Sequence, residues 1–366
     1  MWTHDSPGST LGLEKTLFGT LQNGSKVDKY TLTNSSGLEV AILTYGGIIQ
    51  SIILPDKNGA PADITLGFDT LEDYVNRSPY FGAIIGRYAN RVANGRFTLS
   101  GVEYQIPLND GVHSLHGGHD GFDKKRWDAR SIEDPARVGV ELAYLSPDGE
   151  MGFPGNLAVT VRYTLNNQNE LRLEYFAVTD KETVLNLTNH AYFNLAGAGS
   201  GTVLDSVAFI DADRYTPVDD TLIPTGELHD VKGTPFDFTV PTGIGANVQL
   251  DHEQLKYAEA THGGYDLNWV LNHPGDLNAL AVRVTDPTSG RTVQMYTTEP
   301  AIQFYSGNFL DGTLTGKGGL TYPHWGAFTL EAQHYPDSIN QGHFPTTVLA
   351  PGEQYVQTTI YKFLAL

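Results

Sequence analysis

Apolar and polar residues alternate strictly in two neighbouring runs near the middle of the chain. The first run covers residues 157–165, the second covers residues 171–175, and the turn-forming residues 166–169 lie between them. Alternation with a period of two is typical of β-strands that bury one face. The pattern therefore predicts an antiparallel hairpin.

Turn-forming residues recur from one end of the chain to the other. Clusters of Gly, Pro, Asn, Asp and Ser separate β-branched or aromatic runs at residues 56–59, 100–101, 109–111, 147–149 and 287–290. Helical periodicity is weak, and it is limited to residues 70–74 and 252–258. Strands do not alternate with helices, as they would around a parallel sheet. We expect an all-β fold, a large antiparallel β-sandwich.

The composition agrees with this expectation. The chain has 366 residues, among them 40 Gly, 19 Pro and 19 Tyr, and Gly and Pro weaken helices more than they weaken turn-rich β structures. No shift in composition, low-complexity linker or internal repeat divides the sequence. We expect a polar N-terminal tail over residues 1–12 and a single β-sandwich domain over residues 13–366.

The charge of the chain limits its partners. Asp and Glu number 42 against 23 Lys and Arg, which gives a formal net charge of −19. Phosphate backbones and anionic membrane surfaces would be repelled, so we expect neither nucleic acid nor membrane as a partner. A neutral polyol would be recognised by short-range hydrogen bonds and stacking, and would hardly sense this charge. We expect the protein to be a monomer or a weak homodimer.

The sequence leaves the cellular compartment open. The chain has no cysteine, which excludes disulfides and thiolate chemistry without fixing the compartment. Its first residues lack the basic and apolar regions of a signal peptide. A cytoplasmic location is the default expectation, and export after removal of a signal is the alternative.

Two segments of the second half, residues 187–194 and 329–337, each predict a strand with one apolar and one polar face. The polar faces hold His190 and Glu331. An enzyme that protonates one oxygen while deprotonating another needs such a pair, because imidazolium donates and carboxylate accepts near neutral pH. The alternative for each is an ordinary solvent-exposed residue on an outer strand.

Three further regions carry polar groups suited to a ligand. Residues 113–120 contain three histidines; their irregular spacing and a Gly-Gly break favour a hydrogen-bonding loop over a metal site, with one histidine facing a ligand. Arg87 and Arg91 lie in an irregular stretch and have planar donors that can bind hydroxyl or carboxylate oxygens; paired surface arginines are equally compatible. Asp266 lies on the polar side of another alternating run and could accept hydrogen bonds from sugar hydroxyls.

Taken in order, the motifs resemble the aldose 1-epimerase (galactose mutarotase) family over most of the chain. The resemblance rests on Tyr45-Gly46-Gly47, Gly86-Arg87 with Asn90-Arg91, Leu115-His116-Gly117-Gly118, the run from Thr188 to Leu195, the run from Gln303 to Phe309, and Leu330-Glu331-Ala332-Gln333.

The resemblance implies roles for individual residues. Glu331 matches the family's general base, His190 its general acid, and His116 a residue of the same pocket that shares the acid's work. The sugar-binding positions correspond to Asn90, Arg91, Asp266 and Gln303. The family is a large antiparallel supersandwich that acts on free aldoses and needs neither a metal nor an organic cofactor. Two departures, Trp325-Gly326 and His334-Tyr335, are expected to influence which sugars fit.

Three alternatives remain at this point. A hexose-phosphate 1-epimerase would need additional Lys or Arg beside the pocket to hold the phosphate. A non-catalytic carbohydrate-binding protein on the same scaffold would not need the acid and the base. A glycoside hydrolase would need two suitably spaced carboxylates, for which Glu331 and Asp266 are formally available.

Overall fold

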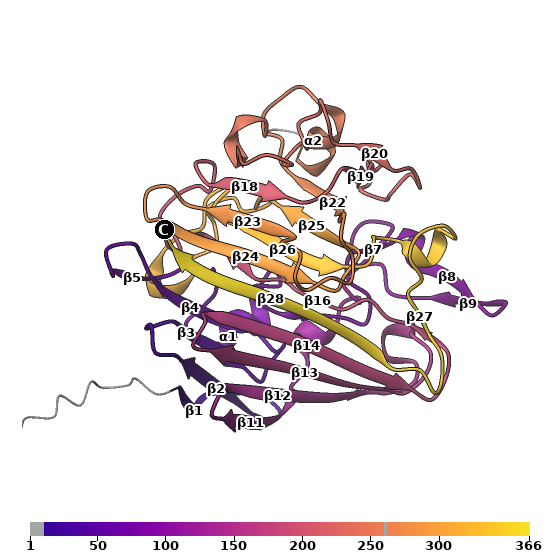
Figure 1. The fold of residues 1–366 in the computed structure, drawn as a ribbon. Helices are drawn as coiled ribbons and strands as arrows, with labels where there is room; N and C mark the ends of the chain where they lie inside the picture. The colour runs from indigo at the N-terminus through magenta and orange to yellow at the C-terminus, as the bar shows by residue number, and fades with distance from the viewer. Residues whose placement is uncertain (1–10, 260–261) are drawn as a thin grey trace, which may run out of the picture.

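The largest layer of the fold is a nine-stranded antiparallel sheet. The computed structural model describes residues 11–259 and 262–366. In this sheet the C-terminal strand β28 lies between β14 and β24, so it joins the middle of the chain to its last third (Figure 1). The strands, in spatial order, are β11 (Asp128–Asp134), β12 (Arg137–Ser146), β13 (Leu157–Asn166), β14 (Glu170–Thr179), β28 (Tyr355–Ala365), β24 (Arg291–Thr297), β23 (Val282–Thr285), β18 (Val207–Ile210) and β21 (Thr242–Gly243).

Two further sheets pack against the large one. The five-stranded sheet comprises β1 (Gly12–Thr20), β2 (Lys26–Thr33), β3 (Glu39–Leu43), β4 (Ile49–Pro55) and β5 (Pro61–Asp63). The six-stranded sheet comprises, in spatial order, β17 (Tyr192–Phe193), β26 (Phe328–Gln333), β25 (Ala301–Tyr305), β22 (Asp266–Val270), β19 (Arg214–Thr216) and β20 (His229–Asp230). The predicted all-β antiparallel sandwich is confirmed.

Short pairs and two helices complete the fold. The two-stranded pairs are β6 (Ile84–Ile85) with β16 (Thr188–Asn189), β7 (Arg91–Val92) with β10 (Ser114–Leu115), β8 (Arg96–Leu99) with β9 (Val102–Gln105), and β15 (Thr183–Val184) with β27 (Val348–Leu349). The helices are α1 (Leu71–Arg77) and α2 (Glu253–Ala258), at the two predicted positions. Each begins with a side-chain cap: Thr70 Oγ1 accepts from the Asp73 N–H, and His252 Nδ1 accepts from the Gln254 N–H. None of the described helices has the length and apolar character needed to cross a membrane.

The core lies between the large sheet and the two smaller ones. The predicted hairpin is confirmed as β13 and β14, whose register runs from Leu157 opposite Thr179 to Leu165 opposite Leu171. Its alternating apolar residues point inward and join one buried cluster with residues of the other sheets. Hydrogen bonds across the layers add to this packing: the Tyr361 hydroxyl of β28 donates to the Leu330 carbonyl of β26.

The segment predicted as one strand over residues 187–194 is two short strands in different sheets. Residues 188–189 form β16 beside β6, whereas residues 192–193 form β17 beside β26. The side chain of Asn189 causes the break, because its Nδ2 donates to the Gly82 carbonyl and its Oδ1 accepts from the Ala191 N–H. Such local side-chain bonds compete with a continuous ladder. His190 therefore lies at a change of strand partner.

Candidate active site

Glu331 lies on β26, the second strand of the six-stranded sheet, on the face turned away from the core. It pairs across the ladder with Gln303 on β25, which in turn pairs with Asn268 on β22. Because strand residues alternate between faces, Leu330 and Ala332 enter the core while Glu331 joins a polar row. The row is not solvent-exposed: Glu331 is only 2% exposed. The alternative of an ordinary surface glutamate is wrong.

His190 lies directly beside Glu331, with its Nε2 3.5 Å from Glu331 Oε1. Its backbone is fixed from both sides, since its N–H donates to the Ala83 carbonyl and its carbonyl accepts from the Gly82 N–H. The ring of Tyr192 stacks on the imidazole at a centroid distance of 5.0 Å. His190 is 4% exposed, so the alternative of a solvent-exposed outer strand is also wrong.

His116 and Asn90 are joined by two hydrogen bonds. The Asn90 N–H donates to His116 Nδ1 at 3.0 Å, and the His116 N–H donates to the Asn90 carbonyl at 3.1 Å. Both residues have a positive φ, 64° and 54°, a conformation that Asn and His tolerate better than most residues. Since Nδ1 accepts a hydrogen bond, the neutral ring carries its proton on Nε2. His116 is therefore held as a hydrogen-bond donor.

Arg91 and Asp266 form a charged pair in the same cavity. Arg91 donates from Nε to Asp110 Oδ2 at 2.7 Å, and its Nη1 lies 3.8 Å from Asp266 Oδ2. The Gln303 side chain donates from Nε2 to Asp266 Oδ1 at 2.7 Å. Gln303 thus supports the aspartate rather than lining the cavity itself. Asn90 uses its Oδ1 to accept from the Arg91 N–H, which leaves its amide nitrogen as a donor.

Together these side chains enclose a cavity of about 150 Å³. Its aromatic wall contains residues that the sequence did not single out as site residues, and they supply the apolar surface against which a sugar ring packs. Tyr80 packs edge-on against His116 at 4.7 Å, and Phe309, whose side chain is 61% exposed, lies at the rim. The residues that line the cavity are Pro79, Tyr80, Asn90, Arg91, Leu115, His116, His190, Tyr192, Asp266, Tyr305, Phe309 and Glu331.

Burial changes the acidity of the central pair in opposite directions. It raises the pKa of Glu331 to about 8, with the nearby Asp266 carboxylate adding to the rise, while the Thr329 hydroxyl and Arg91 oppose it. It lowers the pKa of His190 to about 4. Between these pH values the pair holds one proton. The pKa of His116 is also lowered well below its ordinary value, mainly by burial and further by the nearby His190 and Arg91. The His116 ring is therefore neutral.

One sequence expectation about a neighbouring residue, the role of Arg87 as a ligand-binding group, is wrong, and a second one, about Trp325 and His334, stays a prediction. Arg87 is buried away from the cavity and donates to the backbone carbonyls of Pro154 and Gly155 and to Ser146, so its guanidinium is structural. Trp325 and His334, expected to influence which sugars fit, do not belong to the cavity lining among the described residues. His334 instead pairs with Glu299 through its Nδ1 at 2.7 Å.

The central group also has the residue types of a metal site, but its hydrogen bonds do not suit one. One ligand atom from each of His116, His190 and Glu331 lies within 4.8 Å of the others. A histidine ligates a metal through a nitrogen lone pair. The lone pair of His116 is occupied by the Asn90 N–H, so Nε2 presents a proton. The arrangement fits a ligand with oxygen acceptors better than a cation.

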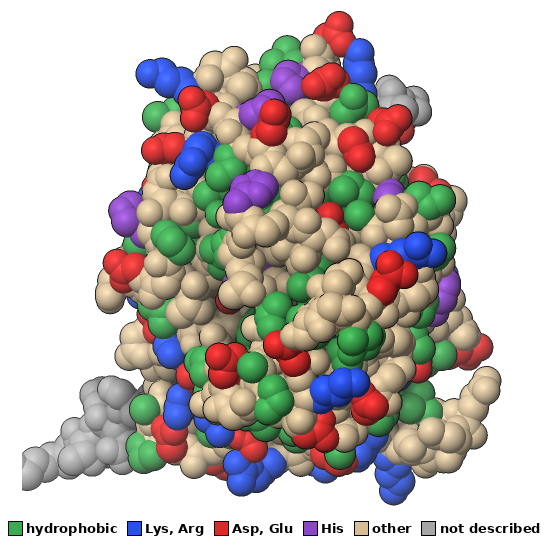
Figure 2. Space-filling model, turned by 90° about the vertical axis from the view of Figure 1, so that its right-hand side faces the viewer, with side chains coloured by type: hydrophobic (Ala, Val, Ile, Leu, Met, Phe, Trp, Pro, Cys, Tyr) green, Lys and Arg blue, Asp and Glu red, His purple; other side chains and the backbone are tan. Residues whose placement is uncertain are grey.

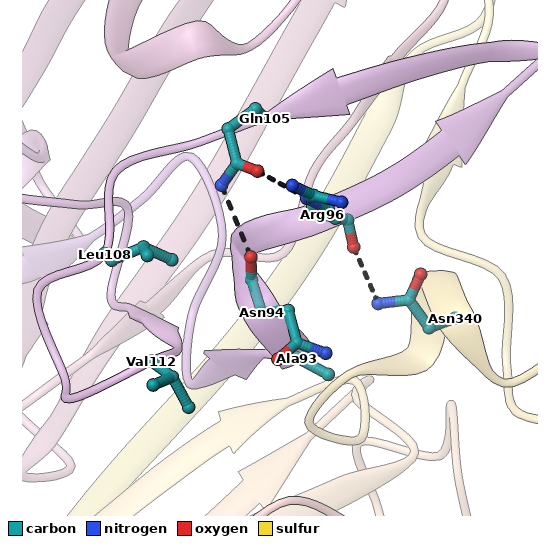
Figure 3. A pocket seen from close by; sticks show the side chains of 7 residues that line it. All are labelled: Ala93, Asn94, Arg96, Gln105, Leu108, Val112 and Asn340. Carbon is teal, nitrogen blue, oxygen red and sulfur yellow. Dashed lines mark hydrogen bonds between the residues drawn. The ribbon is translucent and has the colours of Figure 1, made fainter.

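A second, larger cavity of about 600 Å³ lies beside β8 and β9 (Figure 3). Three of its polar side chains are bonded to protein groups: Arg96 donates to the Gln105 side chain, Gln105 to the Asn94 carbonyl, and Asn340 to the Arg96 carbonyl. It contains no carboxylate or imidazole in its lining. Acidic and basic side chains are interspersed over the molecular face shown in Figure 2. Of these two cavities, the one around Glu331 has the carboxylate and the imidazole that proton transfer needs.

Comparisons with known proteins show the family of this chain. Residues 28–362 match the family model for aldose 1-epimerase. The galactose mutarotase of Bos taurus is 46% identical over 354 residues, covering 96% of this chain and 99% of that protein. The aldose 1-epimerase of Escherichia coli is 40% identical, covering 92% and 94%. The crystal structure of galactose 1-epimerase from Lactobacillus acidophilus superposes with a TM-score of 0.84 at 31% identity, covering 97% and 99%. This chain belongs to the aldose 1-epimerase family.

Proposed function

We propose that this protein interconverts the α and β anomers of free aldoses such as galactose and glucose, with Glu331 and His190 as the two proton-transfer groups. The observation that carries the proposal is the 3.5 Å approach of His190 Nε2 to Glu331 Oε1 in one buried cavity. A monosaccharide is small enough to contact both groups at once. Both side chains are close enough to exchange protons with the bound sugar directly, without an intervening water or side chain.

The reaction requires two proton transfers at neighbouring oxygens of one ring. The Glu331 carboxylate takes the proton from the anomeric hydroxyl, and His190 gives a proton to the ring oxygen, so the C1–O5 bond breaks and an aldehyde forms. Rotation about the C1–C2 bond presents the other face of the aldehyde. The two transfers then run in reverse and close the ring with the opposite anomeric configuration.

The free pair already holds the single proton that this cycle uses. With pKa values of about 8 for Glu331 and about 4 for His190, that proton rests on the carboxyl near neutral pH. A bound sugar changes the balance, because its anomeric hydroxyl donates to a carboxylate and its ring oxygen accepts from a protonated imidazole. Both contacts favour the ionised pair. The proton therefore moves to His190 as the sugar binds.

The surrounding residues hold the sugar in position. We assign the neutral His116, with its proton on Nε2, as a donor to the ring-oxygen side of the sugar, where it assists His190. Asp266, fixed by Gln303 and Arg91, accepts hydrogen bonds from hydroxyls, and Asn90 adds an amide donor. Positioning of this kind converts binding into an aligned reaction geometry.

Local charge favours a free aldose over a phosphorylated one. Arg91 is the one cation among the described residues that line the cavity, and it already faces the carboxylates of Asp110 and Asp266. A phosphate dianion would need unpaired donors. We propose the monosaccharide as the partner, with nucleic acid and anionic membranes disfavoured by the net charge of −19, and a monomer or weak homodimer as the assembly.

The proposal is tested by polarimetry on freshly dissolved α-D-galactose, α-D-glucose, α-D-xylose and L-arabinose. Catalytic amounts of protein should bring the rotation to the spontaneous equilibrium value faster than buffer alone. Glucose 6-phosphate and an aryl galactoside serve as comparison substrates for the epimerase of phosphorylated sugars and for the hydrolase. If the protein binds galactose without accelerating anomer interconversion, the proposed enzymatic function is refuted and the alternative of a carbohydrate-binding protein is supported.

A further inference from the structure

A second cluster of histidine and carboxylate side chains lies outside the sugar cavity. It combines Glu259 and His262, which follow helix α2, with His324, which precedes β26. One ligand atom from each residue lies within 4.8 Å of the others. The cluster therefore joins two segments more than sixty residues apart in sequence, and it uses none of the residues assigned to the reaction.

The His324 ring is oriented as a metal-binding imidazole would be. Backbone carbonyls of Asn308 and Leu310 lie beside the ring and favour a proton on it. Its Nε2 is buried and has no hydrogen-bond partner among the described residues. Histidine ligands commonly hold a proton on one nitrogen with a backbone carbonyl and offer the other nitrogen to the metal.

Two of the three ligands already stand at a coordination distance from each other. His262 Nδ1 lies 3.1 Å from Glu259 Oε2, and two ligands bound at about 2.0 Å in a tetrahedral zinc site are about 3.3 Å apart. The His262 side chain is 54% exposed, so rotation of this ring can shorten the longer separations without disturbing the core.

We propose that Glu259, His262 and His324 bind a divalent transition-metal ion of the zinc class, with water completing its coordination. Two imidazoles and one carboxylate form a ligand set that Zn²⁺ accepts. The net charge of −19 attracts cations to the protein in general. Binding would connect the segment after α2 to the segment carrying His324, and it would stabilise the folded state by mass action.

The aromatic neighbours of the cluster give a direct readout. The ring of Trp325 lies 4.3 Å from His324 and 6.1 Å from His262. A paramagnetic ion bound to these histidines should therefore quench Trp325 fluorescence. The Trp325→Phe variant should bind the metal with unchanged stoichiometry while losing most of that quenching.

The experiment is a Zn²⁺ titration of the untagged full-length protein by calorimetry at pH 7, after metal removal, repeated with Co²⁺ in visible absorption. One ion per chain is expected, with a rise in Tm. Binding should weaken by more than about tenfold in His324→Asn and in the milder His262→Ala, because each loses a ligand. Circular dichroism confirms that the variants fold.

Two controls separate this site from other histidines. His229→Asn removes a surface histidine that pairs with Glu227 at 2.8 Å and lies outside the cluster, and it should leave Zn²⁺ binding unchanged. Glu331→Gln alters the sugar cavity and should also retain Zn²⁺ binding. The proposal is overturned by an absence of stoichiometric binding, by equal affinity in His324→Asn and the parent, or by loss of binding in Glu331→Gln.

Discussion

Replacing Glu331 by Gln tests the central residue with almost no change in shape. The amide keeps an oxygen that accepts the hydrogen bond from the Thr329 hydroxyl, which is 2.9 Å long in the parent protein. It cannot exchange a proton with the sugar. A positioned proton transfer contributes about 10²–10⁴-fold to rate. The rate measured by polarimetry on α-D-galactose should therefore fall by about this factor, which corresponds to an activation barrier higher by roughly 3 to 5 kcal/mol.

The same substitution should stabilise the protein, and the gain should depend on pH. The pKa of Glu331 rises from an ordinary 4.5 to about 8. Below pH 4.5 the Glu331 carboxyl is protonated in both the folded and the unfolded chain, so its burial does not lower the free energy of unfolding. Between pH 4.5 and 8 the unfolded chain releases the proton while the folded protein retains it, and the parent loses stability as the pH rises. At about 1.4 kcal/mol per pKa unit the full cost above pH 8 is on the order of 5 kcal/mol.

Urea unfolding at pH 5 and pH 8 measures this difference. Glu331→Gln should exceed the parent by several kcal/mol at pH 8 and by little at pH 5. Glu170→Gln, on β14 in the large sheet, is the matched control and should leave catalysis within about threefold of the parent. Activity of Glu331→Gln close to that of the parent would refute its role as base, and a stability gain independent of pH would refute the burial argument.

Four other changes have expected outcomes. His190→Asn should fold and lose about 10²–10⁴-fold in polarimetric rate; a smaller loss contradicts its role as acid. In the parent, kcat/KM should fall below about pH 4, where both groups are protonated, and above about pH 8, where both are deprotonated; a flat profile contradicts the single shared proton. Asp266→Asn should raise KM about tenfold with a smaller effect on kcat, and an unchanged KM removes it from the binding set. Arg87→Met should lower the free energy of unfolding in urea by roughly 3 kcal/mol or more, because buried carbonyls lose their donor. A variant as stable as the parent would contradict this structural role.

The regular part of the fold could be read from the sequence because it depends on local pattern. The period-two alternation gave the β13–β14 hairpin with its turn at residues 166–169, and weak helical periodicity at residues 70–74 and 252–258 marked the two helices. Each of these features is determined by residues close together in the chain. Alternation also placed Glu331 correctly on the face opposite to Leu330, since β26 is a regular strand.

The remaining features depend on partners distant in sequence. The break after Asn189 requires the Gly82 carbonyl to accept its side-chain donor, and nothing near residue 189 announces that contact. Arg87 and Arg91 look equivalent in sequence, yet one binds buried carbonyls and the other faces Asp266. Tyr80 had no recognisable signal, because its place in the cavity follows from the positive φ of 66° in a loop. A pattern of residue types cannot distinguish such cases.

The residues proposed to transfer protons and the aromatic residues proposed to contact the sugar lie on different parts of the backbone: the first on paired strands and a fixed strand end, the second on loops. Glu331 is fixed by its ladder pairing with Gln303 on β25, β17 pairs with β26 at Phe328 and Thr329, and the backbone of His190 is fixed by two bonds to residues 82 and 83. Their 3.5 Å separation is thus set by backbone geometry, which a substitution elsewhere in the cavity hardly moves. Tyr80 and Phe309 lie on loops that can change without disturbing that separation. Substitutions at these two aromatic residues should therefore alter the relative KM of different aldoses while leaving the two pH limits of the reaction in place.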